Sequence, residues 1–397
     1  MPKLGRRSLL DLAGGASRRK PEDLDEDLGS AARQLVDEAL GGLEPGELVD
    51  CHVHLLGLGH SGSGAFVNPA MRSWMHPVHH LKFRVYMSAA GIRDLNQADE
   101  QFVERLASLI SGIPGGVRTY LLAFDKHYNQ DGTPNLAKTE FYVPNEYVVA
   151  VAARYPNYFV ATASVHPYRE DALDELQNCA ARGVHIIKWL PNAMGMDPGD
   201  PRIDPFYRKM KELGMTLLTH AGEEKAVEAE EDQHFGNPLL LRRPLELGVT
   251  VIIAHCASLG RNADLERRNH PLVNNFDLFL RLMGEQGYQG QLYGDISAMT
   301  QFNRLPRPLQ VLLERPDLHG RLVNGSDYPL PAVNIVIRLK SLITAGLIDG
   351  SQGELLSEIY HYNPLLFDFV VKRTVRLPRT EQGFPVELFR RRPELAG

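Results

Sequence analysis

The sequence predicts an α/β protein built as a closed (β/α)8 TIM barrel, and three observations lead to this prediction. Short apolar segments alternate eight times with amphipathic helical segments along the chain. Runs such as 249–254 are almost continuously apolar and β-branched, which is typical of parallel strands buried on both faces. Polar residues of a few types stand where several of these strands would end. In such barrels the strand ends gather at one rim, which is where the chemistry takes place.

The length and composition limit the kinds of protein that the chain can form. It has 397 residues and a mass of 44.4 kDa, enough for one large α/β domain with a sizeable core. Apolar runs such as 120–124 fall far short of the roughly 20 residues that span a bilayer, so we expect no membrane segment. The formal charge of -6, without a dominant basic cluster, predicts no nucleic-acid partner. We therefore expect a small-molecule substrate, and a homo-oligomer is left open.

Three scattered cysteines are too few for a disulfide framework or a cysteine zinc site, and they fit a reducing, cytoplasmic location. The first ten residues resemble a twin-arginine export signal only faintly. The apolar stretch after Arg6 and Arg7 is interrupted by Asp11 and soon meets more basic residues. We expect a mobile arm at this end of the chain.

The expected elements divide the chain into an N-terminal extension, a barrel and a tail. The extension covers 1–46 and includes a leader helix over 27–40, where apolar residues recur at helical spacing before two glycines. The barrel covers 47–375 and the tail covers 376–397. The stretch 55–92 shows little periodicity, and we interpret it as a long loop that serves as a lid. The expected strands are 47–54, 117–124, 158–165, 184–190, 215–220, 249–255, 291–296 and 321–326. The expected helices are 97–111, 144–154, 170–181, 204–213, 237–247, 272–286, 306–314 and 333–344.

Two histidines, His52 and His54, end the first expected strand. Alternate side chains of a strand share a face, so both would emerge together, whereas on a helix they would be about 200° apart. Neutral imidazole is the commonest nitrogen ligand for zinc and similar divalent metals. Chance is the simple alternative, because the chain has 15 histidines. The interpretation of this pair as a metal site is therefore supported only if other strand ends supply further ligands.

Four further strand ends supply such residues. Lys188 ends the fourth expected strand, His220 the fifth, His255 the sixth and Asp327 the eighth. Successive members are about one βα unit apart, and the longer gap before Asp327 leaves room for the seventh strand at 291–296. All of these side chains are therefore expected at the same rim of the barrel.

This pattern resembles the amidohydrolase superfamily of metal-dependent hydrolases. The resemblance implies two divalent metals, bridged by a carboxylated Lys188 and by a hydroxide. The implied ligands are His52, His54 and Asp327 for one metal and His220 and His255 for the other. The segment 183–188 looks closest to the phosphotriesterase-like branch. The segments 327–329 and 363–368 look more like the decarboxylase-related branch, whose members often use one metal.

The chemistry of these residue types points to a catalytic metal without the resemblance. Imidazole nitrogen and carboxylate oxygen are ligands of zinc, the metal that we expect, and a catalytic site leaves one position open for water. The metal lowers the pKa of that water toward neutrality. Asp327 can accept a proton as the resulting hydroxide attacks and pass it to the leaving group. Lys188 fits beside a dication only if it is neutral, carboxylated or turned away.

Structural roles are the alternatives for these residues. Lys188 could pair with an acid or anchor a substrate, the two single histidines could be hydrogen-bonded core residues, and Asp327 could cap a turn. Three neighbours, His185, Cys51 and Cys256, have the opposite strand parity from the candidate ligands beside them. We expect His185 to face the helix layer and neither cysteine to be a ligand.

Substrate contacts are expected from the remaining strand ends and from the lid. His127 follows the second strand, His166 ends the third, and Arg84 lies in the basic, histidine-rich stretch 55–92. These three residues are the candidate substrate-binding residues. A basic lid favours an anionic substrate such as a carboxylate or a phosphate, and a solvated loop is the alternative.

The sequence as a whole favours a metal-dependent hydrolase whose activated hydroxide attacks an amide, ester, lactone or phosphoester, with Asp327 and His255 as catalytic residues. The alternative is a mononuclear lyase of the same fold, in which His255 acts as acid and base in decarboxylation. A third reading is a barrel that serves only for binding. The complete set of ligand residues argues against it, since binding alone requires none of them.

Overall fold

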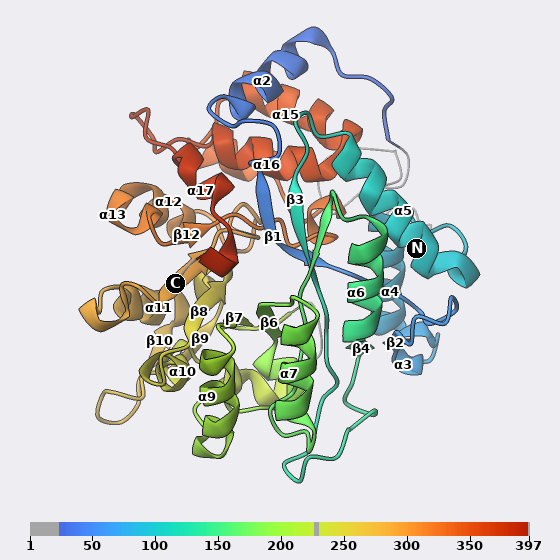
Figure 1. Cartoon of the computed structure of the whole chain (residues 1–397). Helices are drawn as coiled ribbons and strands as arrows, with labels where there is room; N and C mark the ends of the chain where they lie inside the picture. Colours follow the sequence, from blue (N-terminus) through green and yellow to red (C-terminus); the bar gives the residue numbers. More distant parts are fainter. Residues whose placement is uncertain (1–23, 226–229, 396–397) are drawn as a thin grey trace, which may run out of the picture.

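The structure is a computed structural model that describes residues 24–225 and 230–395, so the expected arm over residues 1–23 lies outside the described part. The barrel strands are β1 (Val49–His54), β3 (Arg118–Leu122), β5 (Phe159–Ala161), β6 (Ile186–Trp189), β7 (Thr216–His220), β8 (Thr250–Ala254), β11 (Leu292–Asp295) and β12 (Leu322–Val323). They pair in parallel as two arcs, β1-β3-β5 and β6-β7-β8-β11-β12. Parallel bridges between Ala163 and Ile187 and between Val53 and Tyr328 join the arcs. Within the described residues, eight parallel strands thus close a ring, and the predicted (β/α)8 barrel is confirmed (Figure 1).

Side chains inside the barrel and those outside it form two separate cores. Leu122, Leu218 and Ile252 belong to the interior cluster. Leu217 and Ile253, their neighbours along the strands, belong to the large core between the strands and the helices. This division follows from the alternation of side chains along each strand. A residue that continues the interior parity at the end of a strand therefore enters the mouth of the barrel.

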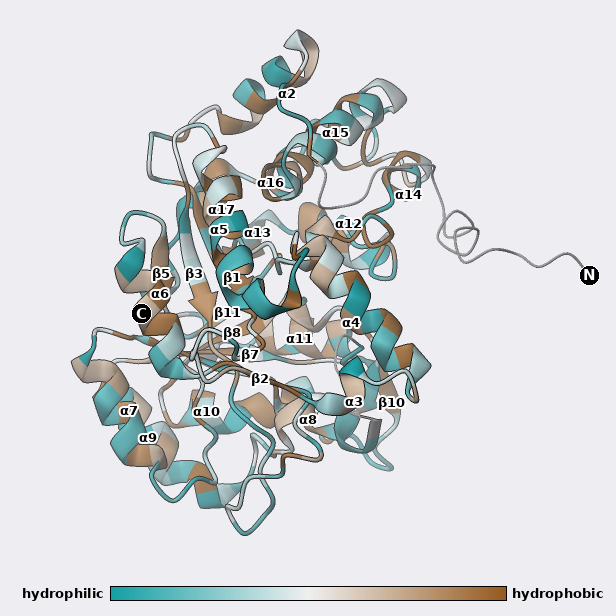
Figure 2. Cartoon of the chain, turned by 90° about the vertical axis from the view of Figure 1, so that its right-hand side faces the viewer, coloured by the Kyte–Doolittle hydropathy of each residue, from teal (hydrophilic) through white to brown (hydrophobic). Residues whose placement is uncertain are grey.

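Helices surround the barrel in chain order (Figure 1). Those that overlap predicted helices are α5 (Ala98–Ser111), α6 (Asn145–Arg154), α7 (Ala172–Ala181), α9 (Asp204–Glu212), α10 (Arg242–Glu246), α11 (Asn275–Met283), α12 (Arg307–Glu314) and α14 (Leu339–Thr344). Figure 2 shows hydrophilic and hydrophobic residues alternating around α7 and α9, as expected for helices with one face on a core. Two short helices, α8 (Pro191–Met194) and α13 (Pro316–His319), were not predicted.

Three predicted helices begin later than expected. The predicted helix 333–344 begins only at Leu339 of α14, and other regular structure occupies the start of the remaining two. The 3-10 turn η4 (Pro238–Leu241) occupies the start of the predicted helix 237–247. Strand β10 (Leu272–Asn274) occupies the start of the predicted helix 272–286 and pairs with β9 (Arg261–Ala263). Apolar residues at the start of 237–247 and of 272–286 lengthened the two predicted helices. In the structure these residues pack in the turn η4 and in the β9–β10 hairpin before α10 and α11 begin.

The stretch 55–92 contains more regular structure than a loop. Strand β2 (Phe66–Val67) pairs with β4 (Phe141–Tyr142), and helices α3 (Pro69–Arg72) and α4 (Pro77–Ala89) follow. Helix α4 buries Phe83 and Met87, which lie four residues apart on one face. Interspersed histidine, lysine and arginine residues hid this periodicity in the sequence. The predicted long connection after the first strand is therefore present, but much of it is helical.

The ends of the described chain pack against the barrel. The predicted leader helix is present as α2 (Ser30–Leu40), and it packs against two helices that the sequence analysis did not predict, α15 (Gly350–Tyr362) and α16 (Pro364–Thr374) (Figure 1). The expected tail contains α17 (Val386–Arg390), which buries Leu388 and Phe389 beside β1 and β12. Among the described helices, none is long and apolar enough to cross a membrane.

Candidate metal centre

Strand β1 brings both of its histidines into the barrel mouth through a β-bulge. Asp50 pairs with Thr119 of β3, but the next pair is Val53 with Leu121, so β1 contains one extra residue. Cys51 faces the barrel interior before the bulge, whereas Val53 faces the outer core after it. The expectation that Cys51 is out of phase with His52 was therefore wrong, because the bulge resets the alternation. The Cys51 thiol is buried and free.

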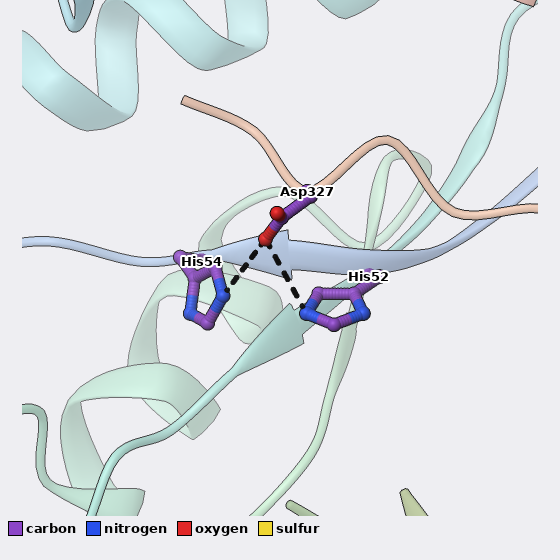
Figure 3. A group of neighbouring side chains, drawn as sticks. All are labelled: His52, His54 and Asp327. Carbon is purple, nitrogen blue, oxygen red and sulfur yellow. Dashed lines mark ion pairs between the residues drawn. The ribbon is translucent and has the colours of Figure 1, made fainter. Parts of the chain in front are cut away.

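His52, His54 and Asp327 meet at the mouth of the barrel (Figure 3). The Oδ1 atom of Asp327 lies 3.2 Å from Nε2 of His54 and 3.5 Å from Nε2 of His52. Asp327 follows β12, and its backbone N–H donates to the carbonyl of His52 over 2.7 Å. The three side chains offer one ligand atom each within 4.8 Å of one another, which is the arrangement that holds a metal ion.

Lys188 points into the same mouth. It shares its strand parity with Ile186 of the barrel interior and is 2% exposed. Its Nζ lies 3.2 Å from Nε2 of His52. Burial lowers the pKa of Lys188 below its usual value, so the neutral amine is favoured relative to a lysine in water. His185, expected against the helix layer, is exposed instead, because it lies before the first residue of β6.

His220 ends β7 with the interior parity of Leu218 and is 4% exposed. Its Nε2 atom is buried and has no hydrogen-bond partner in the described part of the protein. Its Nδ1 lies 3.5 Å from a carboxylate oxygen of Glu224. Burial lowers the pKa of His220 to about 3, so the ring is neutral near pH 7. A buried imidazole nitrogen without a partner is what a metal ligand looks like without its metal, so His220 fits the expected ligand set.

His255 enters the site through its backbone conformation. It follows β8 with the parity of Ile253, which would direct it to the outer core. However, His255, Cys256 and Ala257 all have left-handed φ angles, of 54°, 49° and 48°. This turn leads the imidazole back to the mouth, where its ring centroid lies 5.0 Å from that of His52 and its Nε2 lies 3.9 Å from Oδ2 of Asp327. Three such residues in a row store strain, which is typical of functional sites.

Asp295, a residue that the sequence analysis did not identify, fixes the protonation of two of these histidines. It is fully buried at the end of β11, and its Oδ2 lies 2.7 Å from Nδ1 of His52. Its other oxygen accepts the hydroxyl proton of Ser297 and the backbone N–H of His255. The Ser297 oxygen lies 2.8 Å from Nδ1 of His255 and must accept a proton from it, since its own proton is donated to Asp295.

Both rings are thus held with hydrogen on Nδ1 and a lone pair on Nε2. A carboxylate can only accept, so Nδ1 of His52 carries the proton that it donates to Asp295. Second-sphere hydrogen bonds of this kind orient histidine ligands in metalloproteins. Asp295 lies at the end of the seventh expected strand, so its position as a polar residue at a strand end is the sequence signal that could have identified it.

The sequence matches the family model Amidohydro_2, described as Amidohydrolase, over residues 49–338. The chain belongs to this amidohydrolase family. The matched segment contains the whole barrel from β1 through β12 and every candidate ligand named above. No match was found among curated proteins.

Three solved structures illustrate what the chain resembles. A TIM-barrel protein of Bordetella bronchiseptica described as uncharacterized has 17% identity and a TM-score of 0.48, with 78% of this chain and 98% of that chain covered. A probable 2-pyrone-4,6-dicarboxylic acid hydrolase of Acinetobacter baumannii has 14% identity and a TM-score of 0.43, with 82% and 99% covered. The 5-carboxyvanillate decarboxylase of Sphingomonas paucimobilis has 12% identity and a TM-score of 0.45, with 72% and 91% covered. The family assignment does not depend on these structures.

The three candidate substrate-binding residues lie in different surroundings. His127 is 8% exposed, and neither ring nitrogen has a hydrogen-bond partner among the described residues, although Nε2 lies 3.6 Å from a carboxylate oxygen of Asp232. The ring lines a cavity of about 360 Å³ together with Asn192 and Asp232. His166 is fully buried and uses both nitrogens within the fold, Nε2 with the carbonyl of Met194 and Nδ1 with the backbone N–H of Tyr168. Arg84 lies on the exposed side of α4. His166 is thus held by contacts within the fold, whereas His127 faces a cavity and its part in substrate binding stays a prediction.

Other residues at the mouth were missed by the sequence analysis. Burial raises the pKa of the phenol of Tyr86 in α4, and the charges of Glu224 and Asp327 raise it further. Burial lowers the pKa of His255, and the charge of Arg304, which follows β11, lowers it further. These side chains come from the lid helix and from loops, where no strand periodicity marks them.

Proposed function

We propose that the protein is a metal-dependent hydrolase that attacks an amide, ester, lactone or phosphoester of a small anionic substrate. The observation that carries the proposal is the cluster of His52, His54 and Asp327 at the barrel mouth, next to a partnerless Nε2 of His220. The nitrogen and oxygen donors of this cluster fit a zinc ion. Family membership supports an enzyme that uses a divalent metal and a small substrate.

Some residues of the site would bind the metal, and others would transfer a proton or fix the tautomer of a histidine. When bound, the metal lowers the pKa of a water molecule and polarises the bond under attack. His52, His54 and Asp327 would hold one ion. The Oδ2 atom of Asp327, which faces Nε2 of His255 at 3.9 Å, is placed to accept a proton and to release it to the leaving group. Asp295 and Ser297 keep both Nε2 atoms unprotonated for these roles.

We further propose that Lys188, once carboxylated, would join His220 and His255 in holding a second ion. Carboxylation requires a neutral amine, and burial already favours that form of Lys188. An ammonium group would be repelled by about 4 kcal/mol per unit charge at 4 Å, even with an effective dielectric constant near 20. A carbamate on Lys188 would replace this cation by an anionic oxygen ligand.

Replacement of Lys188 tests this role. Lys188→Ala should lose metal and activity, and added short-chain carboxylic acids should restore part of both. The measurement is metal content by mass spectrometry before and after incubation with acetate. His185→Ala, which removes an exposed side chain of the same segment, is the control and should keep its metal. Full metal content in Lys188→Ala would contradict the two-metal site.

A mononuclear lyase is the second candidate, and one observation favours it. The three ligand atoms of His52, His54 and Asp327 already form a complete set for a single ion. His255 would then be released from ligation, and its unprotonated Nε2 beside Asp327 would serve as acid and base in decarboxylation.

Metal counting and isotope labelling together separate the two candidates. Two ions per chain and incorporation of 18O from labelled water into the products of an amide, ester or lactone panel would support the hydrolase. One ion per chain and release of CO2 from aromatic carboxylates, without 18O in the other product, would favour the lyase. His54→Ala should lose metal under either candidate. A His54→Ala variant that retains its metal would refute both.

A further inference from the structure

Helix α16 places a lysine in the core, next to the segment that carries Asp327. Lys372 is fully buried, and its Nζ donates to Oδ2 of Asp368, one turn earlier in the helix, over 2.5 Å. The same Nζ donates to the backbone carbonyl of Gly325, also over 2.5 Å. Gly325 lies two residues before Asp327. A buried cation thus binds the backbone of the segment that brings a candidate metal ligand to the barrel mouth.

The carbonyl of Gly325 lies where the last barrel strand leaves the sheet. The carbonyl of Val323 accepts from the backbone N–H that follows β11 over 3.0 Å, and that of Asn324 accepts from a backbone N–H of β1 over 2.9 Å. Among the described residues, no backbone N–H donates to the carbonyl of Gly325. A buried carbonyl group needs a donor. Lys372 therefore takes the place of the missing strand partner at this position.

The same segment is bound to β1 beside His52. The backbone N–H of Asp327 donates to the carbonyl of His52 over 2.7 Å. The backbone N–H of Ser326 donates to Asp50 over 2.8 Å, and the same carboxylate oxygen accepts the backbone N–H of His52 over 3.1 Å. A Cβ atom at Gly325 would lie 2.6 Å from Cβ of His52, so the two backbones are in close contact. A shift of Gly325 would therefore move two candidate ligands together.

Stability of the fold alone does not account for the ion pair. Moving two charges out of water offsets their attraction, and well-packed apolar residues of similar volume often stabilise a core as well or better. The Oδ1 atom of Asp368 is also buried and has no hydrogen-bond partner in the described part of the chain, which adds to this cost. The hydrogen bond to Gly325 is the one contact of Lys372 that an apolar side chain could not replace.

We propose that Lys372 is a positioning residue of the metal centre, which holds the carbonyl of Gly325 and thereby fixes Asp327 and His52 in the arrangement that binds a metal. This inference rests on the proposed function, because the arrangement of these ligands matters to a metal that they hold. Asp368 supplies the charge that keeps the ammonium group of Lys372 in the core. The left-handed backbone of Asp327, with a φ of 64°, is a conformation that needs such contacts to persist.

Two variants separate positioning from stability. The double variant Lys372→Met with Asp368→Leu replaces the ion pair by apolar side chains. It should unfold at the same urea concentration as the wild type or a higher one, and its zinc dissociation constant should rise about 10-fold or more. Asp368→Asn keeps the donor of Lys372 and removes only the opposite charge, so it should lose stability and keep most of the zinc affinity. Urea denaturation of metal-free protein and zinc titration against a competing chelator measure the two properties.

Amide hydrogen exchange of metal-free protein gives a readout that requires no metal. Mass spectrometry of the peptide that contains 324–328 should show faster exchange in the double variant than in the wild type, while peptides of α5 should be unchanged. The control is Arg307→Met with Asp277→Leu, which removes an ion pair at the surface between α12 and α11. This control should keep both the zinc affinity and the exchange of 324–328.

A folded double variant with the zinc affinity of the wild type would overturn the proposal. So would an Asp368→Asn variant that loses as much zinc affinity as the double variant, because the donor of Lys372 is still present there. If the double variant does not fold, Lys372→Gln with Asp368→Asn replaces it, since the amide side chain is one bond shorter and loses the contact with Gly325. If the wild type binds no divalent metal, the proposed function fails, whereas unchanged exchange of 324–328 in the folded double variant would refute the role of Lys372 alone.

Discussion

Asp295→Asn should weaken metal binding although it removes no metal ligand. The carboxylate accepts from Nδ1 of His52 at 2.7 Å, while its other oxygen accepts from the backbone N–H groups of His255 and Ser297, each over 2.9 Å. In the variant the amide oxygen can replace the second oxygen, so the amide NH2 must face His52. Two donors then oppose each other unless the His52 proton moves from Nδ1 to Nε2. That tautomer has no lone pair on the atom that faces Asp327 and Lys188.

The expected loss can be estimated from the bond that is removed. A hydrogen bond to a charged group contributes about 1.5–3 kcal/mol, which corresponds to a change of about 10- to 150-fold in a binding constant. Removal of such outer hydrogen bonds from metal-bound histidines typically costs about 10- to 100-fold in metal affinity. We therefore expect the zinc dissociation constant of Asp295→Asn to rise by one to two orders of magnitude.

A zinc titration against a competing chelator measures this change. The control is Asp264→Asn, which alters another fully buried carboxylate, one that contacts Arg281 and Arg267 and not a histidine. This control should lose stability in urea denaturation and keep its zinc affinity. An Asp295→Asn variant with the zinc affinity of the wild type would refute the argument that Asp295 sets the tautomer of His52.

Two further predictions concern packing and pH. A Cβ atom at Gly325 would lie 2.6 Å from Cβ of His52, so Gly325→Ala should displace that ring, weaken zinc binding and cost about 1–3 kcal/mol of stability. The control is Gly320→Ala, where space is open, and it should have none of these effects. Equal zinc affinity in the two variants would contradict the prediction. Burial lowers the pKa of His166 from 6.5 to about 3. Between these pH values the unfolded chain binds a proton at this histidine and the folded chain does not, so the free energy of unfolding decreases as the pH falls from 6.5 toward 3. In urea denaturation the wild type should therefore lose up to about 1.4 kcal/mol more per pH unit in this range than His166→Gln, and parallel pH profiles would show that His166 does not contribute.

The barrel and most of its site could be predicted because both follow from strand periodicity. Lys188 and His220 keep the parity of Ile186 and Leu218 of the barrel interior, so the alternation along the chain places them correctly. Asp295 ends β11 and obeys the same rule, but the sequence analysis did not include the end of this strand among the candidate ligands. The lid helix α4 was missed because its buried face consists of few residues among polar ones, so only the tertiary contact makes the helix evident.

His52 and His255 reach the site through features that alternation does not encode. His52 enters through a bulge that adds a residue to β1, and His255 enters through a left-handed turn that overrides its strand parity. Neither position contains a glycine, which would have marked such a backbone in the sequence. Alternation thus correctly predicts that His52 and His54 share a face, but it predicts neither the bulge in β1 nor the turn at His255.

Several non-glycine residues with left-handed φ angles lie at the mouth of the barrel, whereas Asn269, His270 and Arg379 have such angles elsewhere. His255, Ala298 and Asp327 all have left-handed φ angles without being glycine, and each of them lies just after a barrel strand. Such conformations cost about 1–3 kcal/mol each and persist only when the surroundings hold them in place. Here the holding contacts are specific, since Asp295 binds the backbone N–H of His255, and the backbone N–H of Asp327 binds the carbonyl of His52. Packing of the barrel alone requires none of these turns, because Ile253 and Val323 are already buried before the chain departs from strand geometry. The strain is therefore best explained by the placement of the polar side chains, which is what a catalytic centre built on a strand scaffold requires.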